Sequence, residues 1–154
     1  MHHIHDTMIA AVTGGTGGYE KLQIREVPTP KLRCGEVLVK VLAASVNNTD
    51  INTRLGWYSD KVQKSTTQLA VQANKRGQDT EQLDGWNSKT IFPLIQGTDC
   101  CGIVVKVADS RAENLVGKRV IIRPCIRLKD PPNWSTSIWM GSDFNGSFAN
   151  FISI

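Results

Sequence analysis

The stretch Gly35 to Arg54, GEVLVKVLAASVNNTDINTR, decides the fold of this chain. Its first half is β-branched or large and apolar from Val37 to Leu42, with Lys40 as the one interruption. That composition is typical of a strand with at least one buried face. The strand then breaks into a polar run of four residues, Asn47, Asn48, Thr49 and Asp50. Because polar groups at the rim of a core often bind ligands, this run is the edge of a candidate active site.

The segments on either side of this stretch predict short strands separated by Gly and Pro. Further strands are expected at Gly102 to Val107, Val120 to Arg123 and Gly146 to Ile154, and loops at Asp109 to Leu115 and Asp130 to Gly146. Only Asp50 to Tyr58 suggests a short helical turn, with Asn48, Thr49 or Asp50 as its cap. From the residues alone, capping and catalysis explain the polar run equally well. Many short strands without a long amphipathic helix predict a mainly β fold, a barrel or a sandwich.

A glycine-rich run, Thr13 to Gly18, follows the apolar segment Met8 to Val12 and admits two interpretations. It resembles a dinucleotide-binding turn, whose glycines let a pyrophosphate approach the N-terminus of a helix. Glu20 stands where the last glycine of that motif belongs, and Tyr19 to Val27 alternates with period two, which leaves no room for a helix. The pattern therefore favours a β-hairpin with a glycine-rich loop.

Length, charge and cysteine content narrow the class of protein. The chain has 154 residues, which fits one domain, and a formal net charge of +4 from scattered basic residues, which argues against nucleic acid. Its 4 cysteines form no CxxC pair, so structural zinc is not expected. Without a signal peptide or a membrane-length apolar run, we expect a cytoplasmic protein that binds no membrane. Residues 1–7, with three histidines, read as a disordered leader, and the polar stretch 59–90 reads as an insertion.

Taken together, these motifs resemble the N-terminal GroES-like catalytic domain of the medium-chain dehydrogenase/reductase superfamily, which includes zinc alcohol dehydrogenases and quinone oxidoreductases. The resemblance implies a partly open β-barrel with a few short helices over 8–154. It also implies a Rossmann cofactor domain that this chain does not contain. The matching fragments, in the order of the family, are Glu26-Val27-Pro28, GEVLVKVLAASVNNTD, FPLIQGTDCCGIVVKV, VGKRVII and GSFANFISI.

Two departures from the zinc enzymes matter for chemistry. In zinc members, the positions of Asn47 and Thr98 hold the Cys and His ligands of the catalytic metal, and neither residue here is a good zinc ligand. Of the four-cysteine lobe of those enzymes only Cys125 has a counterpart. An Asn at position 47 resembles the zinc-free quinone oxidoreductases and enoyl reductases. Gly56-Trp57-Tyr58 is similar to the enoyl reductase branch, in which a tyrosine helps to protonate the substrate.

The resemblance therefore implies an NAD(P)H-dependent, zinc-independent enzyme that reduces a carbonyl, quinone or activated alkene. Asn47, Thr49 and Tyr58 would be catalytic: Asn47 would bind the carbonyl or the nicotinamide amide, and the two hydroxyls would donate a proton. Asn48, Asp50, Thr98 and Asp99 would line the substrate cleft, with Asp50 also a structural cap and Asp99 orienting the neighbouring backbone. We expect NADP(H) or NAD(H), and a homo-oligomer, only for a full-length protein, and no cofactor bound to this chain alone.

Two rival hypotheses remain open at this point. A non-catalytic GroES-like binding or scaffold module would keep the barrel and lack the cofactor domain. A zinc enzyme with unexpected ligands among Cys100, Cys101, Cys125 or Asp99 is the other possibility. Adjacent Cys100 and Cys101 would point to opposite faces of a strand, so at most one of the two thiols faces a given site.

Overall fold

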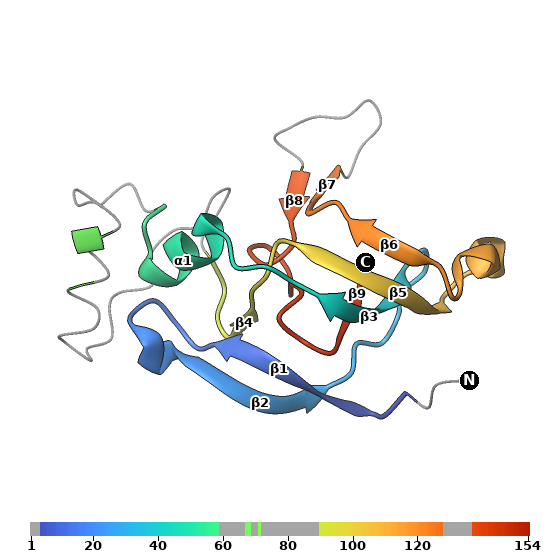
Figure 1. The fold of residues 1–154 in the computed structure, drawn as a ribbon, viewed down its shortest axis with the longest axis horizontal. Coiled ribbons are helices and arrows are strands. Elements are labelled where there is room, and N and C mark those ends of the chain that lie inside the picture. Colours follow the sequence, from blue (N-terminus) through green and yellow to red (C-terminus); the bar gives the residue numbers. More distant parts are fainter. Residues whose placement is uncertain (1–3, 59–66, 69–70, 72–89, 128–136) are drawn as a thin grey trace.

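The computed structural model describes residues 4–58, 67–68, 71, 90–127 and 137–154, and the fold there is mainly β (Figure 1). This confirms the predicted fold class. The strands are β1 (Thr7–Thr13), β2 (Leu22–Pro28), β3 (Val37–Ala43), β4 (Leu94–Ile95), β5 (Cys100–Val107), β6 (Arg119–Ile122), β7 (Cys125–Arg127), β8 (Ser137–Trp139) and β9 (Phe151–Ser153). The short helices are α1 (Asn48–Leu55) and two 3-10 turns, η1 (Tyr19–Lys21) and η2 (Ser110–Leu115).

The predicted central strand, β3, lies inside a four-stranded sheet of order β6-β5-β3-β9. It pairs antiparallel with β5 on one side and with β9 on the other. Val39 in its middle is fully buried, and it packs with Val104, Met140 and Ile152 in one hydrophobic core. Two neighbouring strands and a buried face explain why the run from Val37 to Leu42 is almost continuously apolar.

The predicted hairpin is confirmed: β1 and β2 pair antiparallel from Thr7 opposite Pro28 to Thr13 opposite Leu22. Together with β4 they form a second sheet, of order β2-β1-β4. Met8, Ala10, Val12 and Ile95 bury their side chains from this sheet in a second hydrophobic core. Alternate burial along β1 is what a two-faced strand requires.

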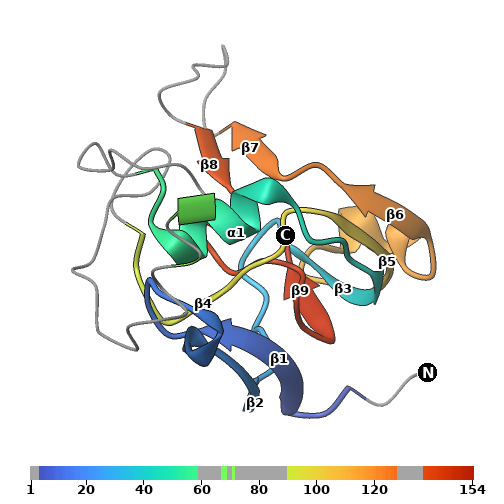
Figure 2. The same cartoon turned by 60° about the vertical axis from the view of Figure 1, so that its left-hand side comes forward.

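The segment before β9 joins the two sheets (Figure 2). The Phe148 carbonyl accepts a hydrogen bond from Ala11 at 2.8 Å, and the Asn150 amide donates to Ile9 at 3.0 Å. A single bridge between Ala10 and Ala149 lies between these bonds. The hairpin sheet and the four-stranded sheet thus meet along one seam, and Figure 1 shows α1 where β3 leaves the larger sheet.

Three sequence predictions about individual segments need correction. Residues Ser110–Leu115 form the 3-10 turn η2 and not a loop, because the Asp109 carboxylate caps it by accepting the Arg111 amide at 2.9 Å. The stretch predicted as a loop after Asp130 contains β8, which pairs with β7. The last strand is only three residues long, since the backbone before it bonds to β1 and to the residues that follow β4.

The bounds of other predicted segments also differ from those in the structure. β1 begins at Thr7, inside the predicted leader, and the backbone carbonyls of His5 and Asp6 accept hydrogen bonds from Thr29. Residues 1–3 and nearly all of the insertion predicted over 59–90 lie outside the described residues. β6 runs from Arg119 to Ile122, one residue earlier than expected.

Candidate functional site

Helix α1 begins at the polar run, and its N-cap is Asn47, one residue earlier than the caps predicted from the sequence. The Asn47 backbone is extended (φ −108°), and the backbone amide of Asn47 donates to the Asp50 carboxylate at 2.8 Å. Asp50 is therefore the third helical residue of a capping arrangement and not the cap itself. Gly56 ends the helix in the left-handed conformation (φ 69°), as a helix C-terminus commonly requires.

Asp50 ties α1 to the segment that follows β4, across a large separation in sequence. One carboxylate oxygen accepts the Asn47 amide, and the other accepts the Gly97 amide at 3.0 Å. The Gln96 side chain donates to the Asp50 carbonyl at 2.9 Å and accepts from the Thr13 hydroxyl at 2.8 Å. Asp50 is 4% exposed, so this carboxylate is committed to the backbone and holds the two halves of the site together.

Asn47 and Thr98, the two residues for which the resemblance implies metal-ligand positions in zinc members, lie in contact. The side-chain amide nitrogen of Asn47, Nδ2, donates to Thr98 Oγ1 at 3.2 Å. Beside this pair the Ser45 hydroxyl donates to the Asp99 carboxylate at 2.6 Å. Hydrogen bonds from Ser45 and from the Asn47 side chain lower the pKa of Asp99 below its ordinary value. Asp99 thus orients two polar side chains, while its carbonyl accepts from Ser147 at 2.5 Å.

The two predicted hydroxyl donors also lie together. The Tyr58 hydroxyl donates to Thr49 Oγ1 at 3.0 Å, and the Trp57 ring meets the Tyr58 ring edge to face with 5.6 Å between centroids. Thr49 and Tyr58 are half-buried, whereas Asn48 is exposed on the first turn of α1. The structure therefore groups the predicted residues into two hydrogen-bonded pairs, Asn47 with Thr98 and Tyr58 with Thr49.

Sequence reasoning missed Arg54, which is 6% exposed. Its guanidinium donates to the Gly17 carbonyl at 2.6 Å and lies 4.9 Å from the centroid of the Tyr19 ring, while its carbonyl accepts the Gly17 amide. The Glu20 carboxylate accepts the Gly18 amide at 2.9 Å. These bonds occupy two amides of the glycine run, which suits a hairpin loop better than a phosphate cradle. The signal available in the sequence was spacing: Arg54 lies four residues after Asp50, on the same helix face.

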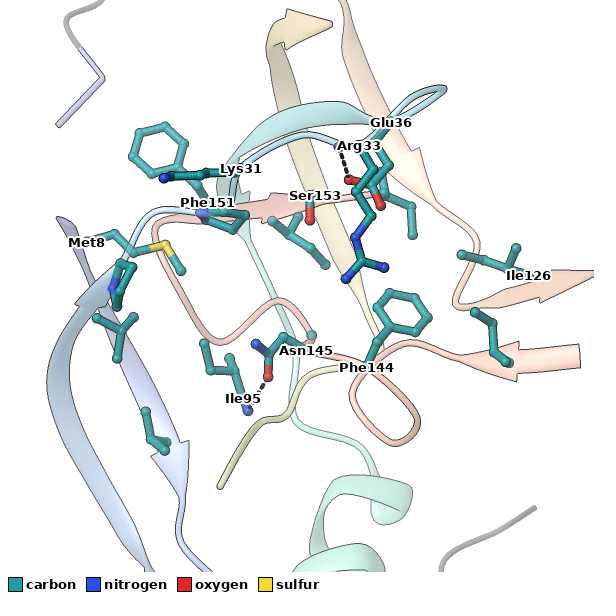
Figure 3. Close-up of a pocket in the computed structure, with 18 of the residues that line it drawn as sticks. Met8, Lys31, Arg33, Glu36, Ile95, Ile126, Phe144, Asn145, Phe151 and Ser153 are labelled. Carbon is teal, nitrogen blue, oxygen red and sulfur yellow. Dashed lines mark hydrogen bonds between the residues drawn. The ribbon is translucent and has the colours of Figure 1, made fainter. Parts of the chain in front are cut away.

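A cavity of about 930 Å³ lies away from these pairs (Figure 3). Its walls are mainly apolar side chains of β1, β2 and β9, with Phe144 and Ile126 opposite. Figure 3 shows the Arg33 side chain beside Glu36, extending toward Phe144 among the lining residues. The residues that line it include none of the predicted site residues, so the cavity and the polar cluster are separate features of the fold.

The donor set of the site does not fit zinc. An amide nitrogen and a hydroxyl that bond to each other are poor ligands, since zinc in proteins takes thiolate, imidazole or carboxylate. Within the described ranges no three His, Cys, Asp or Glu side chains gather into a possible metal site. Burial, and then the neighbouring Cys101, raise the pKa of the Cys100 thiol to about 11, so this thiol is protonated at neutral pH when no metal is bound. Cys125 is buried in β7, in a different sheet.

Comparison with known proteins places the chain in a family. The family model for the alcohol dehydrogenase GroES-like domain matches residues 33–154. An alcohol dehydrogenase of Geobacillus stearothermophilus is 34% identical over 99 residues, which are 64% of this chain and 21% of that protein. An NAD-dependent alcohol dehydrogenase of Sulfolobus acidocaldarius is 23% identical over 141 residues, 86% of this chain and 34% of its own length.

Solved structures agree. A Sinorhizobium meliloti protein classed as an alcohol dehydrogenase is 32% identical, with a TM-score of 0.77, over 100% of this chain and 39% of its own. A crotonyl-CoA carboxylase/reductase shares the fold at 23% identity, with a TM-score of 0.68, over 99% of this chain and 33% of its own. The chain thus spans between about a fifth and two fifths of these relatives. Among the helices that the structure describes, none has the length and apolarity needed to span a membrane. The chain belongs to the alcohol dehydrogenase GroES-like domain family.

Proposed function

We propose that this chain is the substrate-binding part of an NAD(P)H-dependent, zinc-independent oxidoreductase that reduces a carbonyl, quinone or activated alkene. One observation carries the proposal: the two side chains at the metal-ligand positions, Asn47 and Thr98, bond to each other. A site closed in this way has neutral hydrogen-bonding groups where a zinc enzyme needs thiolate and imidazole. Hydride from a nicotinamide would then supply the reducing chemistry, and this chain would bind and protonate the substrate.

The second pair supplies the proton in this proposal. When hydride adds to a carbonyl or enone, negative charge develops on oxygen or on the α-carbon, and a positioned acid lowers the barrier. Tyr58 and Thr49 form a two-hydroxyl chain of 3.0 Å, which can pass a proton from the phenol through the threonine. Asp50 takes no part in the chemistry, because both of its carboxylate oxygens bond to backbone amides.

The test uses the full-length protein with NADH and NADPH against a panel of aldehydes, quinones and enones, followed at 340 nm. We expect oxidation with at least one acceptor, unchanged after dialysis against a chelator. No oxidation with any acceptor would favour the non-catalytic binding module. Loss of activity on chelation, restored by zinc, would overturn the zinc-free assignment.

A matched pair of variants tests the proton donor. Replacing Tyr58 with Phe removes the hydroxyl bonded to Thr49, and we expect kcat to fall about 100-fold. Tyr19→Phe is the control, since Tyr19 is the other of the two tyrosines, is 69% exposed and lies on the hairpin loop. Equal activity of the Tyr58→Phe variant and the control would remove Tyr58 from the mechanism.

A further inference from the structure

The hydroxyl group of Thr98 accepts one hydrogen bond and donates none to the described residues. Its oxygen accepts the Asn47 amide at 3.2 Å, and no hydrogen bond in the described part of the chain uses its proton. Thr98 is 8% exposed, so its side chain has little contact with solvent. A hydroxyl that accepts one hydrogen bond becomes a better donor of its own proton. The Thr98 hydroxyl is therefore available to donate a hydrogen bond to a ligand.

The direction of the Asn47–Thr98 bond follows from Asp99. The Asn47 side chain also lies near enough to the Asp99 carboxylate to help lower its pKa, and the Ser45 hydroxyl donates to the same carboxylate at 2.6 Å. An ionised carboxylate only accepts, so the nitrogen of Asn47, and not its oxygen, must face Asp99 and Thr98. Because that nitrogen can only donate, the Thr98 oxygen has to accept, and its proton is left for another group.

Hydrogen bonds hold the backbone on both sides of this pair. The Asp50 carboxylate fixes the Asn47 and Gly97 amides on the two sides, at 2.8 and 3.0 Å. The Gly97 carbonyl accepts the Ser147 amide at 3.0 Å, which fixes the other face of the same peptide segment. Threonine itself is stiff about χ1. The hydroxyl is therefore held in place before any ligand arrives, which is the condition under which a hydrogen-bond donor stabilises developing charge most.

We propose that Thr98 is the hydrogen-bond donor that holds the substrate oxygen, and that Asn47 is the positioning residue that keeps the Thr98 proton directed toward it. The inference rests on the proposed function and names its electrophilic group. The substrate class it implies is a compound with an accepting oxygen at the reacting carbon or conjugated to it: an aldehyde, ketone, quinone or enone. The Thr98 hydroxyl would stabilise the negative charge that forms on that oxygen, which is the role of the metal in a zinc enzyme.

The first experiment compares Thr98→Val with Thr98→Ser in the full-length protein. Valine has nearly the same shape without the hydroxyl, so we expect kcat to fall about 100-fold with KM changed less than about threefold. Serine keeps the hydroxyl, and we expect kcat within about fivefold of wild type. Circular dichroism and thermal unfolding confirm that both variants are folded before the rates are compared.

The second experiment separates positioning from helix capping at Asn47. As an N-cap, Asp equals Asn and exceeds Ala, so a role in capping alone predicts the activity order Asn, Asp, then Ala. Since an Asp here would also face the Asp99 carboxylate, thermal unfolding must show that each variant is folded before the rates are compared. Under our proposal an ionised Asp at this position accepts the Thr98 proton and removes it from the substrate. The order becomes Asn, Ala, then Asp, with kcat for Asn47→Asp about 100-fold down at pH 8 and that for Asn47→Ala about 10-fold down.

The outcomes distinguish the inference from the proposed function. A wild-type protein that oxidises neither NADH nor NADPH with any acceptor overturns both. A wild-type protein that is active without metal, together with a Thr98→Val variant within about threefold of its kcat, overturns the inference alone. An Asn47→Asp variant more active than Asn47→Ala would remove the positioning role and leave Thr98 to the first experiment.

Discussion

At the scale of single residues, Arg54 uses its charged side chain to make a structural hydrogen bond. Its guanidinium donates to the Gly17 carbonyl at 2.6 Å under the Tyr19 ring, and burial lowers its pKa while Tyr19 and Glu20 oppose that effect. Hydrogen bonds from charged groups typically contribute about 1.5 to 3 kcal/mol, and a buried carbonyl left without a partner adds to the loss. The loop of the hairpin thus depends on a residue of α1.

We predict that Arg54→Met lowers the free energy of unfolding by about 2 to 3 kcal/mol, measured by urea denaturation. Arg111→Met is the control, because Arg111 is 88% exposed and its ion pair with Asp109 is a surface pair that solvent screens, so the loss there should be much smaller. Similar losses in the two variants would show that the Arg54 contacts contribute nothing specific.

Asp50 and Asp99 should give stability opposite dependences on pH. Burial raises the pKa of Asp50 above its ordinary 3.8, with hydrogen bonds from Asn47 and Gly97 opposing, so the folded state binds the proton more tightly. Stability then falls as pH rises from 3.8 through the folded pKa. The pKa of Asp99 is lowered in the fold, so its contribution is present above 3.8 and is lost as pH falls through the folded pKa.

The measurement is urea denaturation of wild type, Asp50→Asn and Asp99→Asn at several pH values from 3 to 6. Relative to wild type, we expect the stability of Asp50→Asn to improve as pH rises and that of Asp99→Asn to worsen. The Asp99 effect should be the smaller of the two, because that side chain is exposed and solvent screens it. Slopes of the same sign would contradict the assignment of these shifts.

At the scale of elements, the connection from β4 to β5 passes the loop between β8 and β9 at very close range. Gly97 has φ +105°, and a Cβ built on it would lie 2.5 Å from Ser147 Oγ and 2.9 Å from the Phe148 amide nitrogen. A Cβ on Gly146 would lie 2.3 Å from the Gly97 carbonyl oxygen. Glycine at these positions is what lets two backbones meet without side chains between them.

We predict that Gly97→Ala costs about 3 to 4 kcal/mol, partly from the left-handed backbone and partly from crowding. Gly35→Ala separates the two causes, since Gly35 has φ +84° with no atom within 4 Å of its Cβ position. It should cost only about 1 to 2 kcal/mol, the price of the backbone conformation. Thermal unfolding of both variants gives the comparison, and equal losses would mean that crowding at Gly97 is relieved by small shifts.

The elements that the sequence predicts well are those whose signal is local. β3 was predictable from consecutive apolar residues, and the hairpin from alternation on both sides of a glycine run. β8 was not, because Ser137 to Trp139 becomes a strand only through pairing with β7. The last strand was predicted too long, since the backbone at Ser147 and Phe148 bonds to Gly97 and Gln96 instead of continuing a ladder.

The candidate site divides in the same way. Asn47, Thr49, Tyr58 and Thr98 were singled out by residue type, motif and resemblance. The pairing of these residues, and the direction in which Asn47 donates, depend on Asp99 and on the frame set by Asp50, which are tertiary contacts. Arg54 was missed for a related reason: a lone arginine on a short helix is usually exposed, and only the returning hairpin loop buries it.

At the scale of the whole molecule, the final described segment belongs to both cores. Ile152 is 2% exposed in the core of the four-stranded sheet, while its neighbours Phe151 and Ala149 pack against the core of the hairpin sheet. The Ile154 carbonyl and amide both bond to Val37, at 2.8 and 3.1 Å, so the same segment also closes the edge of β3. A substitution in this segment should therefore lower the stability of both cores together.

We predict that Ile152→Ala lowers the free energy of unfolding by about 3 kcal/mol and does so in a single transition reported equally by fluorescence and circular dichroism. Ile121→Ala is the control: Ile121 lies on β6, is 86% exposed, and should change stability by less than about 0.5 kcal/mol. Two separate transitions in the Ile152 variant would show that the two sheets fold independently.

The bond between Asp50 and the Gly97 amide spans 47 residues of sequence, and it has an evolutionary consequence. A carboxylate that joins the two ends makes the geometry of the cluster less dependent on the number of residues between them. Closing a flexible loop of twice the length costs only about 0.6 kcal/mol more. Lineages could therefore lengthen, shorten or exchange the intervening stretch with little effect on the polar cluster, which makes this place a natural point for diversification and for the grafting of foreign segments.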